Sequence, residues 1–356
     1  MTATNFFLGA NSGDGFQNLF PQLIEDETMR DLAILKGGPG VGKSTFMKQI
    51  GRAMEKTGTP VEYLWCSGDP DSLDGVLFPA IRCGFVDGTA PHALEPTYPA
   101  AVQRYLDLGR FYDLTAAKAG REEIVARTKE NHGSYIRACR SLKAARQLEL
   151  DAETAARETF DRRRALRRCQ GILAREFRGR GPEKGVTTRR FLGSITCRGP
   201  LWRFDTVDAL CPRVYEFEDN YGLAGELFDL LRHTAEEKGW NTVACLCPEA
   251  PDRIEHLLIP GLGLGFLTAR PGMERGAEPY RRIRLDAMAR PENRARLRFD
   301  LRMARELRED GTEALKDAKT AHDQLEVVYN PYVDFDGVRA LAAVETSRLL
   351  SWMESC

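Results

Sequence analysis

The sequence predicts an α/β fold in which a parallel-sheet core occurs twice in tandem, each copy followed by a long helical hairpin. Three observations lead to this prediction. A glycine-rich loop stands between an apolar run and a helical pattern in the first half. One segment of the first half recurs in the second. After each core there is a long, proline-poor segment rich in helix-forming residues.

Length and composition are those of an ordinary globular protein. The chain has 356 residues, of which 42% are hydrophobic and 29% charged, enough for two domains of typical size. A net charge of -1 gives no overall reason to expect nucleic acid or an anionic membrane as partner. No apolar run approaches a membrane span, and the N-terminus lacks a basic segment followed by an apolar one. We therefore expect a cytoplasmic protein with no membrane partner.

The glycine-rich loop carries the clearest chemistry. The apolar run Leu32–Leu35 leads into Gly37-x-x-x-x-Gly42-Lys43-Ser44, and a helical pattern follows, which is the order of a P-loop. Its glycines let backbone N–H groups surround a phosphate at the positive end of a helix. Lys43 would reach the β- and γ-phosphates, and the Ser44 hydroxyl would complete a Mg²⁺ shell. The predicted ATP and Mg²⁺ site is Gly37, Gly38, Pro39, Gly40, Val41, Gly42, Lys43, Ser44 and Thr45.

A P-loop protein also needs a carboxylate at the end of a neighbouring strand to hold the magnesium shell. Asp87 ends a short apolar stretch, and we expect it to bind Mg²⁺ and to act with Lys43 in catalysis. The alternative is that Asp87 only begins a turn. Asp69, Asp71 and Asp74 follow an earlier apolar run and are the reserve candidates. No second acid follows Asp87 in sequence, so fast hydrolysis is not supported.

Two other groups are weaker candidates. His92 lies close after Asp87 and could orient the terminal phosphate, but a loop histidine satisfied by backbone is at least as compatible with the pattern. The only closely spaced cysteines are Cys245 and Cys247, within an apolar run. Since no second pair accompanies them, we expect reduced core thiols instead of a zinc site.

Several motifs together resemble a known family. They are "LKGGPGVGKSTFMKQI", "CSGDPDSLDGV", "VDGTAPH", "EPTYPAAV" and "LGRFYD". Over nearly its whole length the chain resembles an uncharacterised bacterial family of tandem-duplicated P-loop ATP-binding proteins. The resemblance implies nucleotide binding by Gly37 to Thr45 and marks "DPDSLDG" and "DGTAPH" as signature loops. It implies no particular reaction.

The internal repeat sets the predicted domains. Cys66–Phe85 and Cys247–Phe266 are identical at seven of twenty positions, which is typical of a copied segment. A stretch rich in Gly, Pro and Arg joins the copies and is typical of a linker. The sequence predicts domains at 1–178 and 191–356, joined by a linker at 179–190.

The second copy lacks the chemistry of the first. Gly225, Glu226 and Thr268 stand at the positions of the P-loop lysine, its serine and Asp87. Acidic groups, among them Asp219, stand where a polyphosphate would lie, and like charges repel. This departs from the pattern expected of the resembled family. The second half is therefore predicted to be an inactive pseudo-site.

Helical extensions are predicted at about 100–178 and 285–352. They could bind a protein partner, cover the nucleotide or pack the two halves together, and packing is the favoured interpretation. The segment Arg157–Arg190 is rich in Arg and Lys, but acids punctuate it and aromatic residues are few. A solvated helix face and linker is therefore favoured over a nucleic-acid contact.

The expected function is ATP binding with slow hydrolysis at one Mg·ATP site in the first half. One alternative is a nucleotide or small-molecule kinase, since "GGPGVGKST" also resembles kinase P-loops and "DPDSLDG" could hold an acceptor hydroxyl. Another is a nucleotide-gated binding protein whose arms engage protein or nucleic acid. The products formed from ATP would distinguish these functions.

Overall fold

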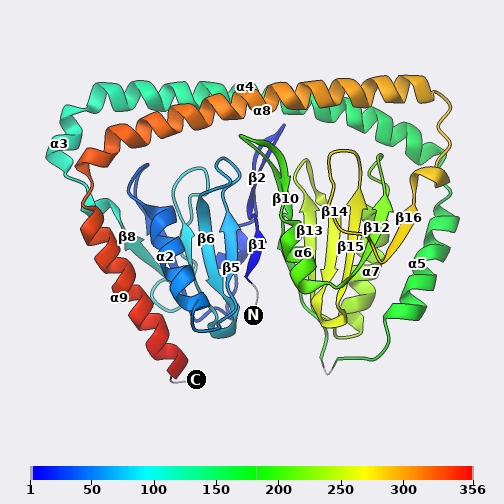
Figure 1. The fold of residues 1–356 in the computed structure, drawn as a ribbon, viewed down its shortest axis with the longest axis horizontal. Coiled ribbons are helices and arrows are strands. Elements are labelled where there is room, and N and C mark those ends of the chain that lie inside the picture. The colour runs from blue at the N-terminus through cyan, green and yellow to red at the C-terminus, as the bar shows by residue number, and fades with distance from the viewer. Residues whose placement is uncertain (1–2, 182, 355–356) are drawn as a thin grey trace.

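The computed structural model describes residues 3–181 and 183–354. The first two residues of the first predicted domain, one position of the predicted linker and the last two residues of the second predicted domain therefore lie outside the described residues. The fold is α/β, with two mixed six-stranded sheets and helices around them (Figure 1). Among the described residues, no helix is both long and apolar enough to cross a membrane.

The first sheet has the strand order β1-β5-β6-β7-β4-β8. Its strands are β1 (Thr4–Phe6), β4 (Asp31–Lys36), β5 (Glu62–Trp65), β6 (Leu73–Phe78), β7 (Cys83–Asp87) and β8 (Gln103–Asp107). Strand β6 is antiparallel to β5 and β7, whereas the other pairs are parallel. The predicted parallel sheet is instead a mixed sheet, because β6 is antiparallel. Only the short 3-10 turn η1 (Pro79–Ile81) separates β6 from β7, and so short a connection can join only antiparallel strands.

The second sheet repeats this arrangement. Its order is β9-β13-β14-β15-β12-β16, and β14 is antiparallel to both its neighbours. The strands are β9 (Thr187–Arg190), β12 (Arg213–Glu218), β13 (Thr242–Cys247), β14 (Ala250–Ile259), β15 (Leu264–Ala269) and β16 (Arg281–Arg284). Each strand thus takes the place of one strand in the first sheet. The central strand of each, β4 or β12, is followed by a helix of 13 residues, α2 (Lys43–Glu55) or α7 (Gly225–Glu237).

The two sheets meet between β1 and β9. Phe7 and Phe191 exchange backbone hydrogen bonds of 2.9 Å in each direction, and both side chains are fully buried. Two small hairpins stand at this junction (Figure 1). They are β2 (Gly9–Ser12) with β3 (Gly15–Asn18), and β10 (Gly193–Thr196) with β11 (Gly199–Trp202).

Two long helices lie antiparallel across one end of both sheets, above the strand ends (Figure 1). They are α4 (Arg121–Glu158) and α8 (Arg294–Tyr329). Small residues let them approach closely: a Cβ on Gly311 of α8 would lie 2.9 Å from Leu142 of α4. The remaining helices are α1 (Pro21–Ile24), α3 (Leu114–Ala119), α5 (Arg162–Glu176), α6 (Phe204–Leu210) and α9 (Phe335–Glu354).

The two halves exchange their last helices. Helix α5 packs against α7 of the second sheet, and α9 packs against α2 of the first. The predicted hairpin within each half is therefore wrong, because α4 pairs with α8 and not with α5. Helix α4 has 38 residues and so extends about 57 Å, which carries the chain from the first sheet to the far side of the second.

Burial explains why the exchanged helices stay in place. Val338, Ala342 and Leu349 of α9 belong to the same buried cluster as Phe46 and Ile50 of α2. Burial of such apolar side chains is the main stabilising contribution in a fold of this kind. The core behind the glycine-rich loop is thus completed by the end of the chain.

Candidate functional site

The glycine-rich loop runs from the buried strand β4 to the first turn of α2. Gly40 and Gly42 have φ angles of 75° and 89°, a left-handed conformation that favours glycine. Gly42 directly precedes α2, whose first residue is Lys43. The loop glycines therefore make the turn that the motif predicts, and α2 begins directly after it.

The structure brings Lys43 beside Asp87. Strand β7 is the parallel neighbour of β4, and Leu35 of β4 pairs with Asp87 at the end of β7. Lys43 Nζ lies 3.5 Å from Asp87 Oδ2 and donates hydrogen bonds to the carbonyls of Gly37 at 2.6 Å and Gly38 at 3.2 Å. The lysine is thus folded onto its own loop, next to the carboxylate predicted for magnesium.

The two hydroxyl residues of the motif differ in their surroundings. The Ser44 hydroxyl accepts a hydrogen bond from the backbone N–H of Leu73 at 3.0 Å, so it faces strand β6. Thr45 is exposed to solvent. The Ser44 side chain thus faces β6, the strand next to β7, which ends at Asp87. The Thr45 side chain faces solvent instead.

Of the reserve acids, two have structural partners. Asp69 accepts hydrogen bonds from the Asp71 N–H and the Ser72 hydroxyl, which closes a turn. Asp71 forms an ion pair with Arg198 of the second half. The hydrogen bond that Arg198 donates to Asp71 lowers the pKa of the Asp71 carboxyl. Both acids are therefore occupied in holding the fold.

Asp74 joins Asp87 in a buried cluster. Gly75 of β6 pairs with Val86 of β7, so the preceding Asp74 and the following Asp87 come at the same end of the ladder. His92 Nε2 lies 3.6 Å from Asp74 Oδ1. Burial raises the pKa of the Asp74 carboxyl.

Sequence reasoning missed this pairing because it placed Asp74 in a loop. The antiparallel pattern of two apolar runs around the short turn at Pro79–Ile81 was the signal that could have revealed it. Strand β6 thus places a second carboxyl beside Asp87 that does not follow it in the sequence.

The end of α8 covers the loop from the other side. The Gly40 N–H donates to Glu326 Oε1 at 3.3 Å. A Cβ on Gly40 would lie 3.1 Å from Asn330 Oδ1. Tyr112, which follows strand β8, donates its hydroxyl proton to the Pro39 carbonyl at 2.6 Å. No local sequence signal could identify Glu326, because it is 286 positions from Gly40.

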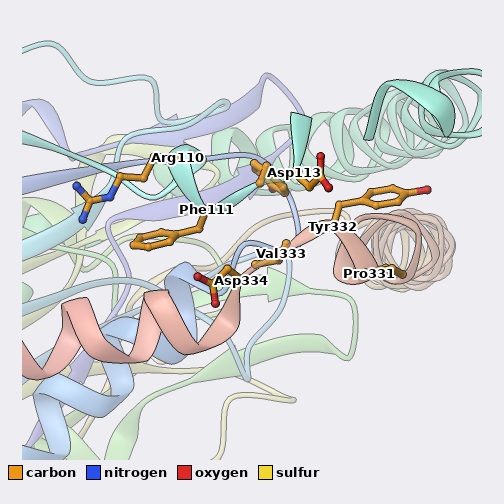
Figure 2. A pocket seen from close by; sticks show the side chains of 8 residues that line it. Arg110, Phe111, Asp113, Pro331, Tyr332, Val333 and Asp334 are labelled. Carbon is orange, nitrogen blue, oxygen red and sulfur yellow. The ribbon is translucent and has the colours of Figure 1, made fainter. Parts of the chain in front are cut away.

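A surface cavity of about 420 Å³ adjoins this region. It forms where two segments are joined by backbone hydrogen bonds, from Asp113 N–H to the Tyr332 carbonyl and from Asp334 N–H to the Phe111 carbonyl. Figure 2 shows the rings of Phe111 and Tyr332 pointing in opposite directions. These two rings therefore form no aromatic clamp over the cavity.

The corresponding loop of the second half is already filled by its own side chains. Asp219 accepts hydrogen bonds from the N–H groups of Leu223 at 2.7 Å and Ala224 at 2.8 Å, and it is 1% exposed. Burial raises the pKa of Asp219. The space that remains between this loop, Arg253 and Arg270 is about 10 Å³. A carboxylate of the protein thus occupies the donors that a phosphate would need.

The two closely spaced cysteines are buried thiols. Cys245 and Cys247 are buried in β13, and all eight cysteines within the described part of the chain are free thiols. Burial raises the pKa of both thiols. This disfavours the thiolate form that metal binding requires.

No protein-family model, no curated protein and no solved structure matches this chain.

Proposed function

We propose that the chain is an Mg·ATP-binding protein and a slow ATPase, built as a tandem duplication of a P-loop domain with one working site. One observation carries the proposal. The loop from Gly37 to Ser44 joins β4 to α2, and Asp87 ends the adjacent parallel strand, 3.5 Å from Lys43. Lysine, serine and a neighbouring carboxylate are the groups that Mg·ATP requires. The resemblance to tandem-duplicated P-loop proteins supports the same function.

The second half would then have a structural role and would not bind nucleotide. Its strand order matches that of the first sheet, which supports a common origin for the two halves. Its loop donors are held by Asp219, and Gly225 and Glu226 replace the lysine and serine. It also supplies α9, which packs against the helix of the working loop.

Nucleotide-gated movement of the arm is the second function that a specific contact favours. We name α8, α9 and the turn between them the C-terminal arm. Glu326 of this arm binds Gly40 in the loop, where a polyphosphate would bring further negative charge. ATP and this carboxylate would repel one another, so nucleotide binding would loosen the arm. Kinase activity lacks such support, because Asp69 and Asp71 are engaged in the fold.

Calorimetric titration of the full chain with a non-hydrolysable ATP analogue and Mg²⁺ tests the proposal. We expect one site per chain in the wild-type protein and none in Lys43→Ala. Two sites per chain, or unchanged binding by the variant, would contradict it. Incubation with ATP, with and without nucleosides, DNA or RNA, then separates hydrolysis from phosphoryl transfer by the products formed.

A further inference from the structure

Three buried side chains with metal-binding atoms lie together behind the loop lysine. They are Asp74, Asp87 and His92, which are 4%, 8% and 5% exposed. One ligand atom from each lies within 4.8 Å of those of the other two. Ligands about 2.1 Å from one tetrahedral metal ion lie roughly 3.4 Å apart, so side-chain movements of up to about an ångström would bring all three onto one ion.

The fold holds these side chains in place. Asp87 Oδ1 accepts hydrogen bonds from the Thr89 N–H at 2.8 Å and from its hydroxyl at 2.6 Å. This turn leads back to His92, whose N–H donates to the Thr89 carbonyl at 3.0 Å. The imidazole ring lies between Phe16 and Phe20, with ring centroids 5.2 and 5.0 Å away. The cluster is thus ordered before any ligand arrives.

Two atoms of the cluster are unsatisfied. Asp74 Oδ2 and His92 Nδ1 are buried and have no hydrogen-bond partner within residues 3–181 and 183–354. Buried polar atoms are nearly always paired, because leaving them unpaired is costly. Lys43 forms its ion pair with Asp87, at 3.5 Å. Asp74 also has the Cys66 thiol beside it, and its unpaired Oδ2 leaves room for a bound cation.

In the second half, the acid at the position of Asp74 is paired with an arginine. Glu255 of β14 takes the place of Asp74, and its buried carboxylate forms an ion pair with the partly exposed Arg270. Thr89 stands in the first half where Arg270 stands in the second, so no arginine is available there. Thr268 and Met273 replace Asp87 and His92 in the second half, so that half lacks the other two ligands.

We propose that Asp74, Asp87 and His92 bind one divalent first-row transition metal ion, such as Mn²⁺ or Zn²⁺, in the absence of nucleotide. Imidazole favours these ions over Mg²⁺ and Ca²⁺, which take oxygen ligands, and the two carboxylates suit their charge. Lys43 already donates to the Gly37 and Gly38 carbonyls and can withdraw from Asp87. Because Asp87 is also the proposed Mg²⁺ ligand, the two sites would share this carboxylate.

The test uses the full chain, stripped of metal with a chelator and titrated with Co²⁺ in the absence of ATP. We expect saturable visible absorption from one ion per chain, displaced by Zn²⁺ but not by Mg²⁺. His92→Gln and Asp74→Asn should each weaken Co²⁺ binding by about tenfold or more. His233→Gln is the matched control, because His233 forms an exposed pair with Glu237 at 3.2 Å, outside the cluster. It should bind Co²⁺ as the wild type does.

The outcomes separate this site from the nucleotide site. Lys43→Ala should lose ATP binding and keep Co²⁺ binding, so failure of one proposal leaves the other readable. A wild-type protein that takes up no Co²⁺, or takes it up only with ATP present, would overturn the proposal. So would a folded His92→Gln variant that binds Co²⁺ like the wild type, even if Asp74→Asn does not fold.

Discussion

The backbone N–H of Gly40 donates a hydrogen bond of 3.3 Å to Glu326 Oε1, across 286 positions of the chain. His322 Nε2 lies 3.4 Å from the same carboxylate. Hydrogen bonds from His322 and then from Gly40 lower the pKa of Glu326, against the opposing effect of burial. An ionised side chain of the arm thus binds a donor of the loop that is proposed to hold phosphate, so arm and nucleotide compete.

Removing this carboxylate should tighten nucleotide binding. Glu326→Ala takes away both the competing acceptor and its negative charge, so we expect the dissociation constant for Mg·ATP to fall by about 3- to 10-fold, the effect of a modest charged hydrogen bond. Calorimetry measures the change. Glu313→Gln is the control, since Glu313 is an exposed residue of the same helix paired with Lys316. Equal affinity in Glu326→Ala and wild type would mean that the arm does not compete.

Asp87 should affect metal-dependent steps more than nucleotide contact. Asp87→Asn removes a carboxylate that would contact phosphate mainly through Mg²⁺, so ATP turnover should fall strongly while binding without metal changes little. Phosphate release and fluorescence titration in chelator measure the two quantities. Equal losses in both would assign Asp87 a structural role.

The loop of the second half that is held by Asp219 should stabilise the fold and should not bind nucleotide. Asp219→Asn places an amide N–H₂ against the backbone donors of Leu223 or Ala224, which should lower the free energy of unfolding by about 1–3 kcal/mol. Urea denaturation measures this loss. The stoichiometry of ATP-analogue binding should stay at one per chain, and a second site in the variant would show that Asp219 alone blocks the loop.

The exchanged helix α9 should stabilise the half to which it is not joined in sequence. Leu349 is fully buried in the cluster of α2, so Leu349→Ala should cost about 2–5 kcal/mol through lost burial and the cavity it leaves. Val344→Ala, on the same helix but 62% exposed, should change stability little. Denaturant unfolding compares the two variants, and equal effects would argue against the exchanged packing.

His256 should make the fold sensitive to mild acid. Burial lowers its pKa from the ordinary value of 6.5 to about 4. Between these pH values the unfolded chain takes up a proton that the folded chain does not. Stability should therefore be complete above pH 6.5 and fall by up to about 3 kcal/mol as the pH drops toward 4.

Thermal unfolding across this pH range tests the prediction. His256→Gln should flatten the slope between pH 6.5 and 4, whereas the exposed His233→Gln should not. A slope unchanged in His256→Gln would assign the acid sensitivity to other groups.

Features that depend on neighbouring residues could be predicted from the sequence. The strand, the glycine-rich loop and the helix beginning at Lys43 follow from a contiguous motif, because positive φ angles and a helix start are local properties. The loss of the same chemistry in the second half could be read from Gly225 and Glu226 in the same way. The place of Asp87 also followed, since parallel strands of one sheet end at the same edge.

Which distant groups meet at this loop depends on how the elements pack. Asp74 comes beside Asp87 because β6 is antiparallel, and a one-residue shift in its register would turn that side chain to the other face of the sheet. Glu326 reaches Gly40 because α4 is long enough to carry the chain across both sheets and α8 returns along it. These contacts depend on packing between elements far apart in the chain, and local pattern carries no information about which surfaces such elements will bury together.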